Sequence, residues 1–392
     1  MKRAFTILYI ICMLSLSACK AGGIYTNYKE VEQLQLVRIM GFDRADNGEQ
    51  QLTVASGKAA ASGPSALLSI SAPSITLCTE RLHDYAASKL LFYDHSQCIL
   101  IGEVCARQGV AEYLSYVERS TEMRTSMDLF VVKGDTARAL MSGSKDESYD
   151  ISQVMDSVQR DMRLRGDTHA FSCGETARAL SEHGAALVCA LMPTNTKDIV
   201  ASVDAGTTAI PKGFGILKDG VLVDFLDEAQ AQAACLVMET GELSTMTLRD
   251  RGGGIATVVL ESCRCEIQPQ WEGERLSRVQ VRLTVDAALS ELSEARQLDD
   301  STFLDDLGHR LAQELSRRCE ILLDKSREHE ADFLGLGRKL RAKDPKAFDR
   351  LDTSWPGQTE FAVSVSASVG RAGDLGNTAS SEGGGMLSVP AQ

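Results

Sequence analysis

The sequence predicts an α+β protein of more than one domain, in which mixed or antiparallel sheets are covered by packed helices. Helix and strand patterns alternate in the first half of the chain, whereas long strands with alternating polar and apolar residues dominate the second half. An amphipathic helix over 301–329 then precedes one last strand, so we expect a C-terminal domain with a long helix across an antiparallel sheet. The apolar content of 44% over 392 residues is enough for more than one core, since single cores stop growing near about 250 to 300 residues.

The N-terminus has the pattern of a lipoprotein signal peptide over residues 1–18. Two basic residues precede an apolar run over 5–16, and Leu-Ser-Ala-Cys at 16–19 is a lipobox, in which Cys19 receives a diacylglyceryl group. The apolar run is about a dozen residues long, whereas a helix needs roughly 20 to cross a bilayer. We therefore expect lipidation at Cys19 and a mature chain that this lipid holds at a membrane. The alternative is an ordinary cleavage site followed by a chance cysteine.

The first half of the mature chain predicts short, alternating elements. Asn47-Gly48 predicts a tight turn, and Ser172-Cys173-Gly174-Glu175 predicts a capping box that opens a helix ending at Glu182. The other elements expected here are structured segments over 31–40 and 51–55, a loop over 59–65, helices over 79–92, 103–119, 136–141 and 152–164, and strands over 97–102 and 127–133.

The second half predicts a hairpin, a helix and a sheet. Asp219-Gly220 between two apolar runs predicts a β-hairpin over 214–226, and 227–238 has a helical pattern. Residues 278–286 alternate polar and apolar side chains without a break, and 361–369 repeat this alternation. The apolar stripe of the helix over 301–329 consists of Leu304, Leu307, Leu311, Leu315, Cys319 and Leu322.

The charge balance argues against nucleic acid as a partner. The formal net charge is −13 and becomes about −15 without residues 1–18, so the mature chain repels nucleic acid and anionic lipid alike. Membrane attachment must therefore come from the lipid on Cys19. Residues 371–392 are rich in glycine and serine with few apolar side chains, which predicts a disordered tail.

Nine cysteines remain when Cys12 and Cys19 are set aside. An exported chain could form disulfides, but Cys98, Cys189 and Cys235 lie inside apolar runs, where cysteine packs as a small hydrophobic residue. We therefore favour buried free thiols over a disulfide framework. Because nine is odd, at least one thiol stays free or pairs between molecules.

The chain contains no motif that predicts catalysis: no P-loop, nucleophile elbow, zinc-protease helix, Cys-x-x-Cys pair or dinucleotide loop. Cys263-Arg264-Cys265 is favoured as strand packing over a metal or redox pair, because its two thiols would share the core face of a strand. The glycines at 252–254 indicate a flexible turn, and His95 is favoured as structural. His309 and His329 are too far apart on their helix to share a metal ion. We therefore predict no catalytic residue, no metal ligand and no cofactor.

Several short stretches occur in order over nearly the whole mature chain. They are the lipobox ending at Cys19, Glu30–Leu34 before Gly41-Phe42-Asp43, Phe92–His95 before Ile101–Glu103, Arg119–Arg124, the hairpin at Asp219-Gly220, and Asp332–Gly337 with Trp355 and the last strand. Together they resemble the C subunit of bacterial spore germinant receptors, the Ger(x)C family of lipoproteins. The order of the stretches is more specific than any one of them.

The resemblance implies a lipoprotein subunit without catalytic residues or a cofactor. Such a subunit assembles with two membrane-embedded partners, the A and B subunits, at the outer face of the spore inner membrane. The receptor detects small nutrients and starts germination. The resemblance also implies three small α+β domains, of which we place two within 19–200 and the third at 205–370.

Two other functions remain as alternatives. A substrate-binding lipoprotein of a transporter would need a cleft between two lobes, lined by aromatic and polar groups, yet aromatic residues make up only 5% of the chain. A lipid-anchored hydrolase or thiol enzyme would need an activated nucleophile beside a base, for example a cysteine of lowered pKa.

Overall fold

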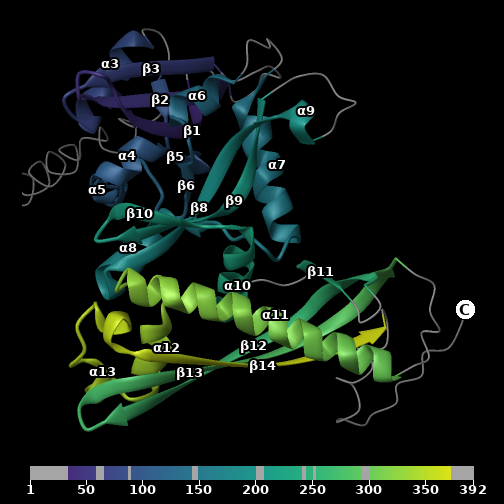
Figure 1. The fold of residues 1–392 in the computed structure, drawn as a ribbon. Helices are drawn as coiled ribbons and strands as arrows, with labels where there is room; N and C mark the ends of the chain where they lie inside the picture. The colour runs from purple at the N-terminus through teal and green to yellow at the C-terminus, as the bar shows by residue number, and fades with distance from the viewer. Residues whose placement is uncertain are drawn as a thin grey trace, which may run out of the picture.

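The computed structural model shows two lobes, each built on its own sheet (Figure 1). The first sheet has ten strands and the second has four, counted over the residues that the structure describes. The predicted α+β class, with mixed sheets and packed helices, is confirmed. The structure describes residues 34–58, 66–86, 90–143, 149–199, 207–240, 244–249, 253–293 and 301–371.

The first sheet has the strand order β10-β9-β8-β6-β5-β1-β2-β3, with β4 beside β1 and β7 beside β6. Its strands are β1 (Leu34–Arg44), β2 (Gln50–Lys58), β3 (Ala66–Ala72), β4 (Leu90–Phe92), β5 (Cys98–Gly102), β6 (Asp128–Val132), β7 (Phe171–Ser172), β8 (Ala185–Asn195), β9 (Thr207–Lys218) and β10 (Val221–Leu226). The helices of this part of the chain are α3 (Ile75–Tyr85), α4 (Glu103–Gln108), α5 (Ala111–Arg119), α6 (Ala137–Ser142), α7 (Ile151–Leu164), α8 (Cys173–His183) and α9 (Thr196–Ile199).

The middle of the first sheet is buried on both faces. β5 pairs in parallel with β1 and with β6, and every residue of β5 is buried. Cys98 and Leu100 belong to the core on one face, whereas Ile99 and Ile101 belong to the core on the other. Parallel strands covered on both sides have continuous apolar sequences, which is why the strand predicted over 97–102 is confirmed as β5.

Helix α10 (Glu228–Met238) joins the two lobes and lies between them (Figure 1). It begins with a capping box of Asp227 and Gln230, and its residues 231–237 are all buried. It packs against β9 of the first lobe and against β12 and α11 of the second. The core on one face of the first sheet therefore continues through α10 into the second lobe.

The second sheet has the order β11-β12-β13-β14. β12 and β13 are antiparallel strands of 18 residues each. The sheet that we expected to be antiparallel is mixed, because α11 carries the chain back along the sheet and β14 therefore pairs in parallel with β13. The elements of this lobe are β11 (Thr245–Arg249), β12 (Ile255–Glu272), β13 (Arg275–Leu292), α11 (Ser301–Glu328), α12 (Leu336–Lys343), α13 (Pro345–Phe348), a 3₁₀ turn (Trp355–Gln358) and β14 (Glu360–Arg371).

The long helix of the second lobe confirms the predicted apolar stripe. Figure 1 shows α11 lying across the second sheet, and five of the six predicted stripe residues, from Leu307 to Leu322, are fully buried, while Leu304 is half-buried. Helix and strand approach closely at Gly308, where a Cβ atom would lie 2.8 Å from the carbonyl oxygen of Ala367 in β14. Glycine at this position therefore sets the distance between α11 and the sheet.

Two predicted helices of the first lobe are wrong in their bounds. The helix expected over 79–92 begins at Ile75, where the Ser74 side chain accepts a hydrogen bond from the N–H of Leu77, and it ends at Tyr85, which is 75% exposed. Leu90–Phe92 forms β4 instead, because these apolar residues pair in parallel with the start of β1.

The helix expected over 103–119 is divided into α4 and α5 at Gly109, which has a φ of +137°. The N–H of Val110 donates to the Gly220 carbonyl oxygen at 2.7 Å, so the break is held by the β9–β10 turn. Strand β3 was not predicted, and the loop expected over 59–65 lies outside the described residues.

The predicted hairpin at Asp219-Gly220 is confirmed as β9 and β10. Both turn residues have positive φ, +51° and +77°, as in the type I′ turn that suits a hairpin. We expected this hairpin to begin the domain at 205–370, but β9 pairs with β8 over almost its whole length and so completes the first sheet. The two sheets divide at α10, and the predicted division into domains stays a prediction.

Candidate functional site

The predicted lipidation site Cys19 lies outside the described residues, as do the signal peptide over 1–18 and the tail after Arg371, the last residue of β14. Lipid attachment therefore stays a prediction. Within the described part of the chain, no helix combines the length and the apolar character needed to cross a membrane.

Asp43 forms a buried corner in the first lobe. Its carboxylate is 2% exposed and accepts hydrogen bonds from the N–H groups of Ala137 at 2.9 Å and Arg138 at 2.8 Å, at the start of α6. Burial raises the pKa of Asp43, and these two hydrogen bonds oppose the rise without cancelling it. A Cβ atom at Gly102 would lie 2.1 Å from Asp43 Oδ1. The stretches around Gly41-Phe42-Asp43 and Ile101–Glu103 therefore meet at one packed corner.

Asp332 forms a corresponding corner in the second lobe. It is 1% exposed, and its carboxylate accepts from the N–H groups of Leu336 at 2.8 Å and Gly337 at 2.6 Å, at the start of α12. The Nδ1 atom of His183, from α8 of the first lobe, lies 3.9 Å from Asp332 Oδ2. Burial raises the pKa of Asp332, although its backbone hydrogen bonds and His183 favour the charged form. This corner therefore brings a first-lobe side chain against a buried carboxylate of the second lobe.

Asp224 of β10 makes a second polar contact between the lobes. Lys325 of α11 forms an ion pair with its carboxylate, and His329 Nε2 lies 3.3 Å from Asp224 Oδ2. Lys218 Nζ donates to the His329 carbonyl oxygen at 2.7 Å. Burial alone would raise the pKa of Asp224, but Lys325, the Phe225 N–H and His329 together hold it below its usual value. The end of α11 is thus tied to the β9–β10 hairpin.

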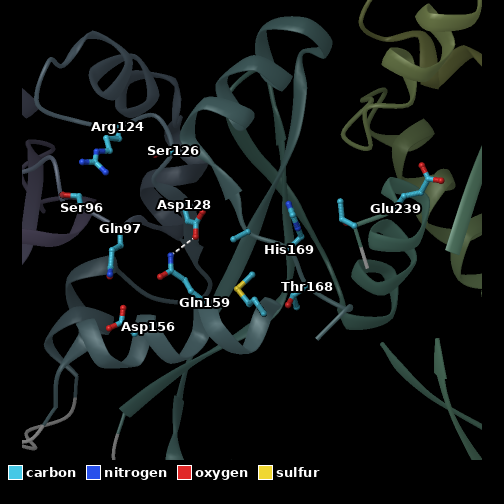
Figure 2. A pocket seen from close by; sticks show the side chains of 13 residues that line it. Ser96, Gln97, Arg124, Ser126, Asp128, Asp156, Gln159, Thr168, His169 and Glu239 are labelled. Atoms are coloured by element: carbon cyan, nitrogen blue, oxygen red, sulfur yellow. Dashed lines mark hydrogen bonds between the residues drawn. The ribbon is translucent and has the colours of Figure 1, made fainter. Parts of the chain in front are cut away.

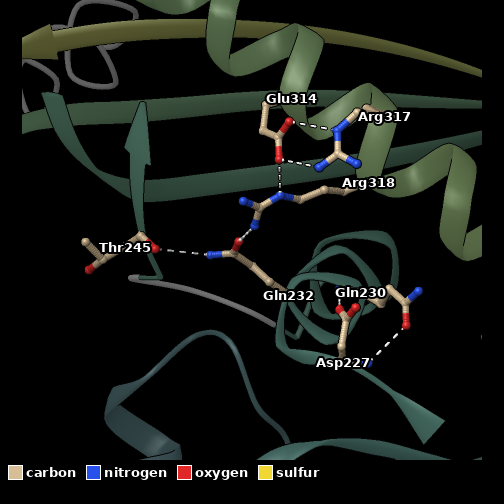
Figure 3. Close-up of polar contacts among 7 residues, drawn as sticks. All are labelled: Asp227, Gln230, Gln232, Thr245, Glu314, Arg317 and Arg318. Atoms are coloured by element: carbon tan, nitrogen blue, oxygen red, sulfur yellow. Dashed lines mark hydrogen bonds and ion pairs between the residues drawn. The ribbon is translucent and has the colours of Figure 1, made fainter. Parts of the chain in front are cut away.

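A chain of hydrogen bonds ties α10 to the second lobe (Figure 3). Gln232 of α10 donates to the Thr245 carbonyl oxygen at 3.4 Å and accepts from Arg318 Nη1 of α11 at 2.6 Å. Arg318 and Arg317 both donate to Glu314. The hydrogen bond from Arg317 is the main reason that the pKa of Glu314 falls to about 2. Gln232 is therefore a buried polar side chain of α10 that has hydrogen-bond partners on both sides.

A cavity of about 720 Å³ lies between α7, the segments that lead into β5 and β6, and the residues that follow α10 (Figure 2). Asp156 and Gln159 reach it from α7, Gln97 and Asp128 from the starts of the two strands, and His169 from the segment before β7. Glu239 contributes from the second lobe, so the cavity lies where the lobes meet. The lining residues include no Phe, Tyr or Trp.

Asp94 and Arg124 fix one wall of this cavity. Arg124 donates from Nε and Nη2 to the two carboxylate oxygens of Asp94, at 2.9 and 3.1 Å. This bidentate hydrogen bond lowers the pKa of Asp94 below its usual value. The stretches Phe92–His95 and Arg119–Arg124 are therefore joined by one ion pair, and His95 packs its ring against Phe92.

The nine cysteines outside the N-terminal segment are all free, as we predicted. Eight are buried and Cys263 is half-buried, and burial raises the pKa of every one of them. Cys263 and Cys265 face the core while Arg264 is exposed, which confirms the packing interpretation. None of these thiols has the lowered pKa that a thiol enzyme requires.

The side chains of the described residues form no group of three or more His, Cys, Asp or Glu placed to hold a metal ion. His309 and His329 both lie in the region of α11, and His329 contacts Asp224. The turn predicted at 252–254 joins β11 and β12, and only its last two glycines are described.

Two family models match the chain in order. The spore germination protein N-terminal domain matches residues 27–191, and the spore germination B3 and GerAC-like C-terminal domain matches residues 212–373. The chain belongs to the Ger(x)C family of spore germination receptor subunits. The resemblance noted from the short sequence stretches is thereby confirmed. The Ger(x)C models divide between residues 191 and 212, within the region where β8 pairs with β9.

The fold of this Ger(x)C protein is similar to the crystal structure of the GerBC protein, with a TM-score of 0.55 and 20% sequence identity. The likeness covers 87% of this chain and 99% of that one, and at this identity it shows the fold alone. A comparison with curated proteins finds no match.

The sequence did not single out the cavity. Gln97, Thr168 and His169 were not considered as site residues, and no local pattern joins them. The one available signal was that polar Gln97 and Asp128 stand at the starts of buried strands.

Proposed function

We propose that this chain is the lipid-anchored C subunit of a nutrient germinant receptor. It assembles with the A and B membrane subunits at the outer face of the spore inner membrane and works in triggering germination by contact with them, not by catalysis. The observation that carries the proposal is the order of three features along one chain: a lipobox at 16–19, then the two spore germination domains over 27–191 and 212–373.

The packing of the two lobes supports a role in assembly. One core runs from the first sheet through α10 into the second lobe, and the Lys325–Asp224 ion pair and the approach of His183 to Asp332 add polar contacts between the lobes. Two lobes that share a core present their outer surfaces in a fixed arrangement, as docking onto membrane partners requires. The raised pKa values of the nine thiols weigh against the thiol enzyme considered from the sequence.

Replacing Cys19 in the full chain tests the anchor. Cys19→Ala removes the only thiol at the lipobox, so in spores the protein should lose palmitate labelling, leave the membrane fraction and support little nutrient-triggered germination. Cys12→Ala is the matched control, because it changes the other signal-peptide cysteine but leaves the lipobox intact. Normal labelling and normal germination in the Cys19→Ala spores would contradict the proposal.

Crosslinking in spore membranes tests the assembly. A lysine-reactive crosslinker should join the wild-type chain to the A or B subunit in membranes from dormant spores. The Cys19→Ala chain should give these products only weakly, because it is no longer held beside its partners. Crosslinks to transporter subunits instead would favour the substrate-binding alternative.

A further inference from the structure

Strand β3 is an open edge of the first sheet. Among the described strands it pairs with β2 alone, in one unbroken antiparallel register from Ala66 to Ala72. Its sequence, ALLSISA, contains no proline and no charged side chain, and the pairing has no bulge. Proline, charge and bulges are the features that keep exposed edge strands from pairing with other chains. Figure 1 shows β3 and α3 at the end of the first lobe that lies farthest from the second lobe.

The opposite edge of the same sheet, β10, is protected. Its register with β9 shifts part-way along the strand, and α4 packs against it. Arg107 Nη1 donates to the Val223 carbonyl oxygen at 3.5 Å, and Lys325 Nζ donates to that of Phe225 at 3.2 Å. Charged side chains thus occupy backbone acceptors of β10. The first sheet can therefore be extended more readily at β3 than at β10.

Apolar side chains are exposed around the β3 edge. Of the seven large apolar side chains that are exposed in the described part of the chain, three belong to β3 and α3, namely Leu67, Leu77 and Tyr85. Leu68 and Ile70 pack against the first-lobe core but are only half-buried, whereas their partners in β2 are fully buried. The apolar row that crosses β2 and β3 therefore ends at an uncovered edge.

The sequence of β3 is complementary to itself when two copies run antiparallel. With Ser69 of both copies opposite each other, Leu68 of one copy lies opposite Ile70 of the other, and this pair occurs twice. Both pairs lie on the sheet face that carries α3, because Leu68, Ile70 and the buried side of α3 belong to the same core. Each apolar side chain then meets another one instead of water, in addition to the hydrogen bonds of a new ladder.

Helix α3 packs on β2 and β3 and runs back along them from the end of β3. Cys78 Sγ lies 3.4 and 4.0 Å from backbone carbonyl oxygens in the last residue pairs of β3, about two residues beyond Ser69. Two strand residues, at about 3.3 Å each, correspond to about four residues of helix. The level of Ser69 on α3 therefore falls between Arg81 and Asp84.

Arg81 and Asp84 are exposed and have no ion-pair partner among the described residues. Arg81 Nη1 already reaches β3, where it donates to the Ser71 carbonyl oxygen at 2.9 Å. A two-fold axis at Ser69 places the two copies of α3 antiparallel on one face of the joined sheet. Arg81 of each copy then faces Asp84 of the other, so opposite charges meet at two places.

We propose that β3 is a dimerisation edge, at which two copies of this chain pair antiparallel about Ser69 and join their first sheets into one. Any extended strand could complete the backbone ladder, but a copy of this chain also brings a second α3 with matching charges. The edge has seven residues, so the interface is small and we expect a dissociation constant in the micromolar range. The proposal needs neither the lipid nor the A and B subunits, so it can fail while the proposed receptor function stands.

Disulfide trapping tests the pairing of Ser69 with its copy. Ser69→Cys is made in the full-length chain, which is purified in detergent and treated with copper phenanthroline as the oxidant. A covalent dimer should form, because exposed Ser69 faces Ser69 of the second copy. The wild-type chain should stay monomeric under denaturing conditions, since eight of its nine described thiols are buried.

Ser366→Cys is the matched control, because Ser366 is an exposed serine of β14 in the second lobe. Two chains that share a micelle by chance would trap either cysteine equally. No dimer from Ser69→Cys, or as much dimer from Ser366→Cys, would overturn the proposal. In spore membranes, a disulfide from Ser69→Cys to a different protein instead of a second copy would overturn it as well.

Two further cysteine variants test the register. In the proposed pairing Leu67 lies opposite Ser71 of the second copy. A mixture of Leu67→Cys and Ser71→Cys chains should therefore give a mixed disulfide dimer, whereas each variant alone should give little. Dimers from each variant alone that equal those from the mixture would show that the strands do not pair about Ser69.

A charge exchange tests the contact between the two copies of α3. Arg81→Glu should weaken dimerisation by about tenfold in sedimentation velocity, because two acidic groups then face each other at each place. The double variant Arg81→Glu with Asp84→Arg restores opposite charges and should return to within about threefold of the wild-type protein. Thermal melting checks that each variant folds. A double variant that dimerises no better than Arg81→Glu would exclude the proposed contact.

Discussion

Asp43 in the first lobe and Asp332 in the second each accept two backbone N–H groups at the start of a helix, but their surroundings differ. The partners of Asp43 all belong to the first lobe, whereas Asp332 also lies 3.9 Å from His183 of the opposite lobe. The corner at Asp43 can therefore form within one lobe. The corner at Asp332 is completed only when the lobes are in contact.

The two sheets also differ in how far their own lobe covers them. β5 in the first sheet is buried along its whole length by the cores of both faces. In the second sheet, β14 alternates exposed serines with valines that are half-buried or buried, and α11 covers one face. The first lobe thus contains a complete two-sided core, while the second adds α10 and α11 to close a core that the two lobes share.

The largest expected effect comes from removing either buried aspartate. Asp43→Ala and Asp332→Ala each leave two backbone N–H groups without their buried acceptor, so each should lower the free energy of unfolding by about 2–4 kcal/mol, measured by urea denaturation. Asp344→Ala is the control: this exposed residue accepts one hydrogen bond, from the N–H of Ala347, and its loss should cost about 1 kcal/mol.

Hydrogen exchange on the same variants tests the difference between the two corners. Asp332→Ala should speed exchange in α12 and also in α8, because His183 loses its neighbour across the lobes. Asp43→Ala should speed exchange around α6 and leave α12 unchanged. If α8 exchanges at the wild-type rate in Asp332→Ala, the contact between His183 and Asp332 does not stabilise α8.

The sequence predicted the second lobe better than the first, for a physical reason. β13 and α11 are long, and each keeps one face buried, so their periods of two and about 3.6 residues are visible over many residues. In the first lobe, Leu90–Phe92 has too few residues to show a period, and its state is decided by pairing with β1. Local chemistry was enough for turns and caps, as at Asp219-Gly220 and Ser172.

The candidate cavity could not be predicted in this way. Gln97, Asp156, Thr168 and Glu239 lie far apart in the sequence and come together only through the order of the strands and the position of α10. The partnership of Asp94 with Arg124 depends on the same arrangement. The family stretches that contain Asp94 and Arg124 were recognised from the sequence, but the ion pair between them was not.

A glycine-to-alanine substitution in the second lobe should lower the free energy of unfolding by an intermediate amount, and the same substitution in the first lobe is its control. Gly308→Ala places a Cβ atom 2.8 Å from the backbone oxygen of Ala367, which cannot move aside alone, so α11 must shift from β14. We expect a net loss of about 1–2 kcal/mol, although alanine favours helix over glycine by about 1 kcal/mol. Gly57→Ala in β2 is the control, because nothing lies within 4 Å of its Cβ position, and its effect should stay within about 0.5 kcal/mol. A higher melting temperature for Gly308→Ala would show that helix propensity outweighs the close contact.

The smallest expected effect is a pH dependence of opposite sign in the two lobes. Burial raises the pKa of Asp43 above 3.8, so the folded state holds this proton more tightly than the unfolded chain, and the stability from this group is present at low pH and is lost as the pH rises through the raised pKa. The pKa of Glu314 is lowered from 4.5 to about 2, so its contribution is present above 4.5 and is lost as the pH falls toward 2.

Melting temperatures between pH 7 and pH 3 can separate these two contributions. The melting temperature of Asp43→Asn should fall further below that of the wild-type protein as the pH falls toward 4, because only the wild-type protein is stabilised by protonation of Asp43. The difference in melting temperature between Glu314→Gln and the wild-type protein should shrink below pH 4.5, because Glu314 of the wild-type protein then loses its ion pairs with Arg317 and Arg318. Since Glu314 is partly exposed, we expect its effect to be the smaller of the two and to weaken further in salt. If the differences in melting temperature change in the same direction with pH in both variants, the pKa of Asp43 is not raised while that of Glu314 is lowered, and the contrast between the two carboxyl groups fails.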